Sequence, residues 1–210
     1  MIRVLIADEH PLLREGVVHA LALEPDFAAP GEAGSSHEVL RMLEKAAWDV
    51  IVLGLSMPGR GGLETLSEIR RLKRTTPVLV LTAHSEVQFV LRAIKAGANG
   101  YITKNASPSE IVAAIRKVAA GKSYFTPAVA ESLAASMAFP GSPPPNEELT
   151  DREFLVACRI AAGKTVSQIA GEISLSVKTV HIYRARTLKK LGVRTNAELT
   201  RYALQRGWVV

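Results

Sequence analysis

Apolar runs alternate with helical patterns along the first part of the chain. The strand-like runs cover residues 2–7, 50–55, 77–82 and 100–103. Between these runs, apolar residues recur at three- and four-residue spacing, which is typical of helices that bury one face. Sequences that can cap a helix N-terminus begin at Ser35, Ser85 and Ser107.

Strands that are apolar along their whole length, each followed by a helix, indicate a parallel sheet covered on both faces. Five helical patterns, four of them preceded by such a strand run, fill residues 1–122 as five strand–helix repeats. They predict an α/β fold, a flavodoxin-like doubly wound five-stranded parallel sheet of order 2-1-3-4-5. Ligands of such a sheet bind beyond the carboxyl ends of its strands. At that edge we expect Asp8, Glu9, Gly54, Thr82 and Lys104.

A change in composition separates this domain from the rest of the chain. Residues 126–138 are Ala-rich and predict a helix, which the Pro-rich residues 140–145 cannot continue. We therefore divide the chain into a domain at 1–122, a linker at 123–146 and a second domain at 147–210.

The second domain has the pattern of four short helices. Capping boxes begin at Thr150, Thr165 and Thr195, and Ser176 can cap a further helix. A three-residue turn at 174–176 lies between the second and third of these helices. This spacing predicts a small all-α helix-turn-helix domain.

Basic charge is concentrated in the second domain. The chain carries 26 Lys+Arg against 20 Asp+Glu, a formal charge of +6. Residues 150–210 hold 11 basic and four acidic side chains, whereas residues 1–122 are nearly neutral. A basic module beside a neutral one predicts a domain that binds a polyanion such as double-stranded DNA.

The helix predicted at 177–191 carries cations and no acid. At 100° per residue, its core side consists of Val177, Val180, Leu188 and Leu191. The opposite side, suited to the DNA major groove, consists of Lys178, Ile182, Ala185, Arg186 and Lys189, with His181 at its flank. Arg184 falls on the apolar side, so we expect it to pair with an acid such as Glu153 or Glu172.

Composition excludes several classes of protein. With 48% hydrophobic and 22% charged residues, the chain is not disordered throughout. It has no apolar run of roughly 18 residues and no signal-peptide pattern, so we expect a cytoplasmic protein without a membrane segment. The single Cys158 excludes an intrachain disulfide and a thiolate metal cluster. We interpret His10, His37 and Cys158 as structural.

Nucleotide and flavin sites are not predicted. Residues 121–123 and 163–165 end like a phosphate-binding loop, but Arg116 and Cys158 stand where that loop requires its earlier glycine. Aromatic residues make up 5% of the chain, and no flavin-stacking loop is present.

Acidic, hydroxyl and basic side chains meet at the predicted strand ends. Asp8 and Glu9 can gather a hard cation through carboxylate oxygens. Acids at this place also suit the first turn of the helix that Pro11 opens. Thr82 and Lys104 favour the first interpretation, because a hydroxyl and an ammonium beside a cation suggest recognition of a phosphoryl group.

The two domains together resemble a two-component response regulator of the NarL/FixJ type, a receiver domain joined to a LuxR-type helix-turn-helix domain. The resemblance covers essentially the whole chain. Its receiver markers are residues 4–11, 55–59, 81–83, 97–101 and 103–104. Its output markers are residues 149–153, 168–170, 174–180 and 188–192.

The resemblance implies roles for the strand-end residues. They are the Mg²⁺ ligands Asp8 and Glu9, the phosphoryl-binding Lys104, and the switch pair Thr82 and Tyr101. The family's phosphoacceptor aspartate ends the third strand, where this sequence has Gly54. Glycine cannot form an acyl phosphate and gives Mg²⁺ no oxygen, so any Mg²⁺ binding would be weak.

Two explanations of Gly54 are open. In the first explanation Gly54 is natural, and the chain is a pseudo-receiver regulated by dimerisation, by a partner or by a ligand in the pocket. Alternatively, Gly54 replaces the aspartate of an ordinary receiver, which would have a sensor histidine kinase as its partner.

We therefore predict a non-enzymatic, DNA-binding transcription regulator that acts as a homodimer. The candidate base contacts are His181, Ile182, Ala185 and Arg186. The candidate phosphate or positioning contacts are Lys178, Thr179, Tyr183, Lys189 and Lys190. Two alternatives are a receiver that sequesters a kinase or partner protein, and a flavodoxin-like small-molecule-binding protein.

Overall fold

The computed structural model describes residues 1–58, 61–72, 75–83, 87–126, 129, 149–173 and 175–209. The chain divides into two compact units, Met1–Pro140 and Gly141–Val210, and the division lies within the predicted linker. The Ala-rich helix expected at 126–138 and the Pro-rich segment at 140–145 lie almost wholly outside the described residues.

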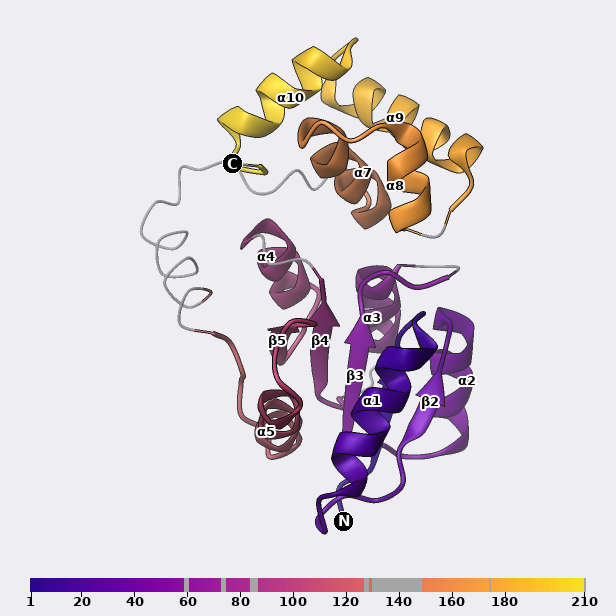
Figure 1. The fold of residues 1–210 in the computed structure, drawn as a ribbon, viewed down its shortest axis with the longest axis vertical. Coiled ribbons are helices and arrows are strands. Elements are labelled where there is room, and N and C mark those ends of the chain that lie inside the picture. The colour runs from indigo at the N-terminus through magenta and orange to yellow at the C-terminus, as the bar shows by residue number, and fades with distance from the viewer. Residues whose placement is uncertain are drawn as a thin grey trace. The chain divides into compact units, whose positions relative to one another are not determined.

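The first unit is an α/β domain (Figure 1). Its strands are β1 Val4–Ala7, β2 Gly31–Ala33, β3 Val50–Gly54, β4 Val78–Thr82 and β5 Gly100–Thr103. Its helices are α1 Pro11–Ala22, α2 Ser36–Lys45, α3 Gly62–Arg71, α4 Val87–Lys95 and α5 Pro108–Ala119. All pairs are parallel and the strand order is β2-β1-β3-β4-β5, which confirms the predicted fold.

Both faces of the sheet are covered, as the apolar strands predict (Figure 1). Because side chains alternate along a strand, one face of β1 packs with α1 and α5 through Val4 and Ile6. The other face packs with α2 and α3 through Leu5 and Ala7. β2 gave no apolar signal because it is a three-residue edge strand that includes the exposed Glu32.

The helix N-termini follow the predicted caps. The Ser107 side chain accepts a hydrogen bond from the Glu110 N–H, and the Glu110 carboxylate accepts one from the Ser107 N–H, which completes a capping box. The Ser35 side chain likewise accepts from the Glu38 N–H. The cap predicted at Ser85 lies outside the described residues.

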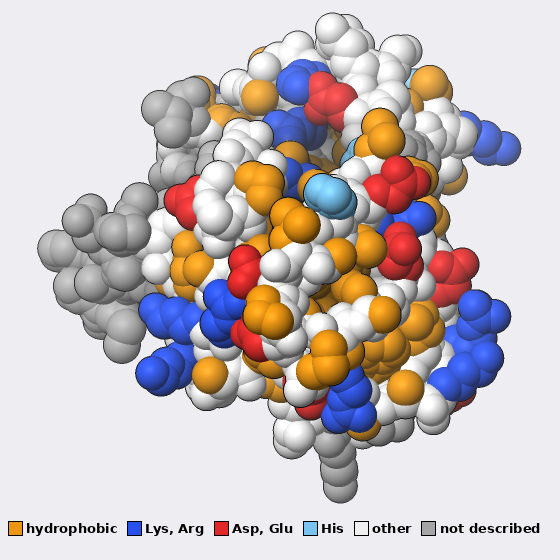
Figure 2. Space-filling view, turned by 60° about the horizontal axis from the view of Figure 1, so that its bottom comes forward, with side chains coloured by type: hydrophobic (Ala, Val, Ile, Leu, Met, Phe, Trp, Pro, Cys, Tyr) orange, Lys and Arg blue, Asp and Glu red, His pale blue; other side chains and the backbone are white. Residues whose placement is uncertain are grey.

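Hydrophobic side chains also reach the surface of the first unit. A groove of about 220 Å³ lies between α1 and α5, and its lining includes Leu12, Gly16 and Ile111. Leu12 of α1 and Leu23, the residue after α1, are among the most exposed large hydrophobic residues. Figure 2 shows hydrophobic side chains gathered on one face, among scattered charged ones.

The second unit is all-α. Its helices are α7 Asp151–Ala161, α8 Val166–Glu172, α9 Val177–Leu191 and α10 Asn196–Gln205. Capping boxes at Thr150 and Thr165 are confirmed, and Ser176 caps α9. The box at Thr195 is only half formed, because Glu198 accepts from the Arg194 N–H instead of the Thr195 N–H.

An aromatic cluster closes the core of this unit. The rings of Phe154 and Trp208 lie edge to face with centroids 4.9 Å apart, and Tyr202 meets Trp208 at 5.4 Å. Such pairs stabilise a core beyond the area they bury. Among the described residues of both units, no helix is long and apolar enough to cross a membrane.

Candidate functional sites at the strand ends and on helix α9

Side chains predicted to meet at the carboxyl edge of the sheet do meet there. Asp8 directly follows β1, Gly54 ends β3, Thr82 ends β4 and Lys104 follows β5. The Lys104 N–H donates to the Thr82 carbonyl at 2.7 Å, which fixes the chain as it leaves β5. The Lys104 Nζ reaches the Asp8 Oδ2 at 2.6 Å.

The Asp8 carboxylate is the centre of this pocket. Its side chain is 2% exposed, and that of Lys104 is 17% exposed. The His10 N–H donates to Asp8 Oδ1 at 2.9 Å, and the His10 Nδ1 lies 2.9 Å from the same oxygen. Arg14 holds the backbone of the segment by donating to the Asp8 carbonyl at 2.8 Å. Asp8 Oδ1 is therefore held by His10, whereas Asp8 Oδ2 has the ion-pair contact with Lys104 and accepts no hydrogen bond of good geometry.

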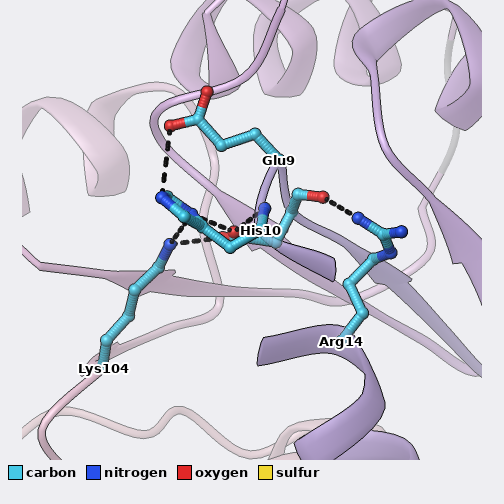
Figure 3. A network of polar contacts seen from close by, with 5 residues as sticks. Glu9, His10, Arg14 and Lys104 are labelled. Carbon is cyan, nitrogen blue, oxygen red and sulfur yellow. Dashed lines mark hydrogen bonds and ion pairs between the residues drawn. The ribbon is translucent and has the colours of Figure 1, made fainter. Parts of the chain in front are cut away.

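His10 is the strand-end residue that sequence reasoning missed. Its Nδ1 also lies 3.3 Å from the Lys104 Nζ, and its Nε2 lies 4.0 Å from Glu9 Oε1, so His10 stands between the acids and the lysine (Figure 3). In the sequence His10 has no partners at metal-ligand spacing, which indicates a structural residue. Its position directly after the acidic pair at a strand end was the available signal.

Position 54 has no room for a side chain in this arrangement. A Cβ built on Gly54 would lie 2.3 Å from Asp8 Oδ2 and 3.1 Å from Asp8 Cγ. The first distance is far below any ordinary contact. The Asp8 carboxylate therefore occupies the space into which a residue-54 side chain would extend.

Asp8 and Glu9, the expected magnesium ligands, do not fit a magnesium ion as they are arranged. Mg²⁺ demands a near-octahedral set of oxygens, but Asp8 directs both of its oxygens at His10 and Lys104. Within the part of the chain that the structure describes, no three His, Cys, Asp or Glu side chains are grouped to hold a metal.

Thr82 and Tyr101, the expected switch pair, are both buried in neighbouring strands. Tyr101 is in register with Val80, two residues before Thr82, so Thr82 and Tyr101 share one face of the sheet. Their role as a switch stays a prediction.

Helix α9 presents the predicted polar face to solvent. Lys178, His181, Ala185, Arg186 and Lys189 are exposed, and Ile182 is 44% exposed. On the opposite side Val180 and Leu188 are buried, as predicted. Val177 is 44% exposed, so its assignment to the core was wrong; it lies in the first turn of α9.

Two cations of α9 have partners that the sequence did not reveal. The Arg184 Nε donates to Asn196 Oδ1 at 2.7 Å, so the expected pairing with Glu153 or Glu172 is wrong. Glu172 instead pairs with Lys164 and Arg159. The Lys190 Nζ lies 2.7 Å from Glu153 Oε2, which fastens α9 to the start of α7.

The Glu153 carboxylate is 3% exposed and is stabilised as an anion. Burial alone would raise the pKa of Glu153, but the bonds from Lys190 and from the Thr150 N–H outweigh it and lower the pKa below its usual range. The buried Thr187 adds a bond from its Oγ1 to the Glu153 carbonyl at 3.2 Å. Lys190 is therefore a structural link as well as a predicted DNA contact.

Known protein families match both units. Residues 4–116 match the response regulator receiver domain, and residues 147–203 match the luxR family of bacterial regulatory proteins. The chain is similar to the transcriptional regulatory protein UhpA of Salmonella typhimurium, with 40% identity over 208 residues that cover 99% of this chain and 100% of UhpA. It is 35% identical to the response regulator UvrY of Escherichia coli over 208 residues, which cover 99% of this chain and 95% of UvrY.

A solved structure agrees over both units. The RcsB response regulator of Salmonella typhimurium matches with a TM-score of 0.60 and 25% identity, covering 97% of this chain and 98% of RcsB. The receiver sheet, the helix-turn-helix unit and the relatives that match along nearly the full length lead to one conclusion. The chain belongs to the response regulators that join a receiver domain to a luxR-family regulatory domain.

Proposed function

We propose that this chain is a DNA-binding transcription regulator of a two-component signalling system, and that its receiver works without phosphorylation at position 54. The observation that carries the proposal is the exposed face of α9, on which cations surround Ile182 and Ala185. A small or apolar residue among cations suits the major groove, where thymine methyls and base edges lie close to the helix. The protein acts by binding and not as an enzyme.

Double-stranded DNA is the partner that this surface favours, and a homodimer on two half-sites is the assembly we propose. If the native gene encodes aspartate at position 54, a sensor histidine kinase is a further partner. With Gly54, no side-chain nucleophile stands at the end of β3.

The full chain and residues 147–210 alone should both bind duplex DNA, because the basic surface is local to the second unit. The logarithm of the binding constant should fall with the logarithm of salt concentration, with a slope of about −0.9 per phosphate contacted. Gel shifts over a salt series measure this. Absence of salt-sensitive binding by both proteins would contradict the DNA assignment and favour a receiver that sequesters a partner protein.

Substitutions on α9 should separate base contacts from phosphate contacts. His181→Ala or Ile182→Ala should change the preference for the specific site over random DNA, with about 1–3 kcal/mol at stake for a lost base contact. Lys189→Ala should weaken binding to all sequences alike, as expected for a lost phosphate contact. Lys190 is less suitable for this test because it also pairs with Glu153, so its substitution would disturb the fold as well.

Competition gel shifts with specific and random duplexes measure both effects. Lys45→Ala, which removes an exposed cation from α2, is the control for loss of a cation elsewhere. Equal losses on both duplexes for His181→Ala and Ile182→Ala would place these residues away from the bases.

A further inference from the structure

An ion pair spans the carboxyl edge of the receiver sheet. Asp8 follows β1 and Lys104 follows β5, and these strands are separated in the sheet by β3 and β4. Strand neighbours lie about 4.8 Å apart, so the two segments belong to strands roughly 14 Å apart. The 2.6 Å contact of Lys104 Nζ with Asp8 Oδ2 therefore ties together distant parts of the edge.

This contact depends on the absence of a side chain at position 54. Gly54 ends β3, the strand between β1 and β4. Its missing Cβ would lie 2.3 Å from the Asp8 oxygen that Lys104 binds. Any other residue at position 54 would have to push this carboxylate aside.

The other neighbours of Asp8 hold it in the same place. The backbone N–H and the ring Nδ1 of His10 both lie 2.9 Å from Asp8 Oδ1, the oxygen that Lys104 does not use. The Arg14 guanidinium donates to the Asp8 carbonyl. The buried Asp8 carboxylate and the partly buried Lys104 ammonium compensate each other's charge, so the pair needs no further cation.

We propose that the Asp8 carboxylate takes the place of the missing side chain at position 54 and is the permanent partner of Lys104. The strand-end pocket then keeps one arrangement without magnesium and without a phosphoryl group. This inference rests on the proposed function, since it names what replaces phosphorylation at this edge. It makes Asp8 and Lys104 positioning residues that compensate each other's charge at this edge.

A double-mutant cycle in the full chain tests the pairing. Asp8→Asn and Lys104→Met should each lower the melting temperature of the receiver by roughly 10 °C, because each leaves a buried charge without its partner. The double variant should lose clearly less than the sum of the two. Asp49→Asn is the matched control, since its Arg3 ion pair is far more exposed, with side chains 38% and 50% accessible. Additive losses in the cycle would overturn the proposal.

Magnesium provides a second readout on the same proteins. Adding MgCl₂ should leave the melting temperature of the unaltered chain unchanged, because the Lys104 ammonium already lies beside Asp8 Oδ2 and His10 holds Oδ1. If MgCl₂ raises the melting temperature by several degrees when both samples are heated at the same rate, the acids do take up the cation, and the proposal is overturned.

The Gly54→Ala variant tests the role of the empty position without removing a charge. Its methyl group should displace the Asp8 carboxylate, and the held ammonium of Lys104, visible by ¹⁵N NMR in the unaltered chain, should lose its signal. Gly16→Ala on α1 is the matched control, because nothing lies within 4 Å of its Cβ position. A Lys104 signal that survives in Gly54→Ala, or that is absent in the unaltered chain, would count against the ion pair.

Failure of this inference is distinguishable from failure of the proposed function. DNA binding is measured by gel shift with and without a small phosphodonor. If the ion pair is absent while DNA binding stays indifferent to the phosphodonor, only the Asp8–Lys104 inference falls. If DNA binding requires the phosphodonor, the proposed function falls as well.

Discussion

The Gly54→Asp variant should take up one phosphoryl group from a small phosphodonor with magnesium, whereas the unaltered chain should take up none at position 54. An aspartate there would add the carboxylate nucleophile that the end of β3 lacks. It would also add a third carboxylate beside Asp8 and Glu9, from which magnesium could take oxygen ligands together with the phosphoryl group. Lys104 and Thr82 would meet the same phosphoryl group from β5 and β4. Intact-mass spectrometry of both proteins measures the difference.

From the sequence, an aspartate at position 54 is expected to be tolerated, with some loss of stability from repulsion among three carboxylates when no cation is bound; the structure adds a steric cost. Gly54 is buried, and Asp8 Oδ2 already lies where the new Cβ must stand. Asp8 must therefore move before the variant can fold around three carboxylates. Without magnesium we expect a loss of about 1–3 kcal/mol in unfolding free energy, from crowding and from like-charge repulsion.

Two controls give this experiment its meaning. Gly54→Asn has nearly the same shape but no carboxylate nucleophile, so it should stay unmodified. A chelator should prevent modification of Gly54→Asp. A folded Gly54→Asp protein that stays unmodified with magnesium and phosphodonor would contradict the assignment of position 54, as would a chelator-sensitive acyl phosphate on the unaltered chain.

The second large effect concerns the link between α7 and α9. Glu153→Gln should destabilise the helix-turn-helix unit by about 2 kcal/mol at neutral pH, because the neighbouring Lys190 loses its anionic partner. This value is below that of a fully buried pair because Lys190 is 37% exposed. Denaturant unfolding, followed by the fluorescence of the buried Trp208, measures it.

The same pair predicts a pH dependence. Because the pKa of Glu153 is lowered in the folded state, its contribution is present above the ordinary carboxyl pKa, about 4.3. It is lost as pH falls below that value and through the lowered folded pKa. The unaltered unit should therefore lose stability between about pH 5 and pH 3 more steeply than Glu153→Gln. Glu172→Gln removes a carboxylate that is 36% exposed, against 3% for Glu153, so this variant should keep the steep dependence; identical slopes for all three proteins would contradict the assignment.

The periodicity of the sequence was sufficient for the fold. Strands apolar on both faces require helices on both faces, so the runs at residues 50–55 and 77–82 predict a parallel sheet from the sequence alone. Caps such as Ser107 and Thr150 use side chains to satisfy backbone groups a few residues away, and they were therefore readable locally. The three-residue strand β2 carries too few side chains for a pattern, and it was located only by its pairing with β1.

The sequence predicted where the candidate sites lie, but not which side chains contact one another within them. A parallel sheet brings all its carboxyl ends to one edge, so Asp8, Thr82 and Lys104 had to converge there. A helical wheel likewise gave the exposed face of α9, although it misplaced Val177 in the core. The periodicity of a sequence indicates to which side of a helix or strand a side chain points. It does not indicate which residue from elsewhere in the chain that side chain contacts.

The sequence by itself determined that this chain builds a receiver sheet, a helix-turn-helix unit and a glycine at the end of the third strand. Only the tertiary structure decided what each charge meets. The Asp8 carboxylate lies where a residue-54 side chain would extend, and it pairs with Lys104 and with His10. Lys190 of α9 pairs with Glu153 of α7. The physical reason is that a buried charge takes whichever compensating group packing brings within reach, and that group can stand anywhere along the chain.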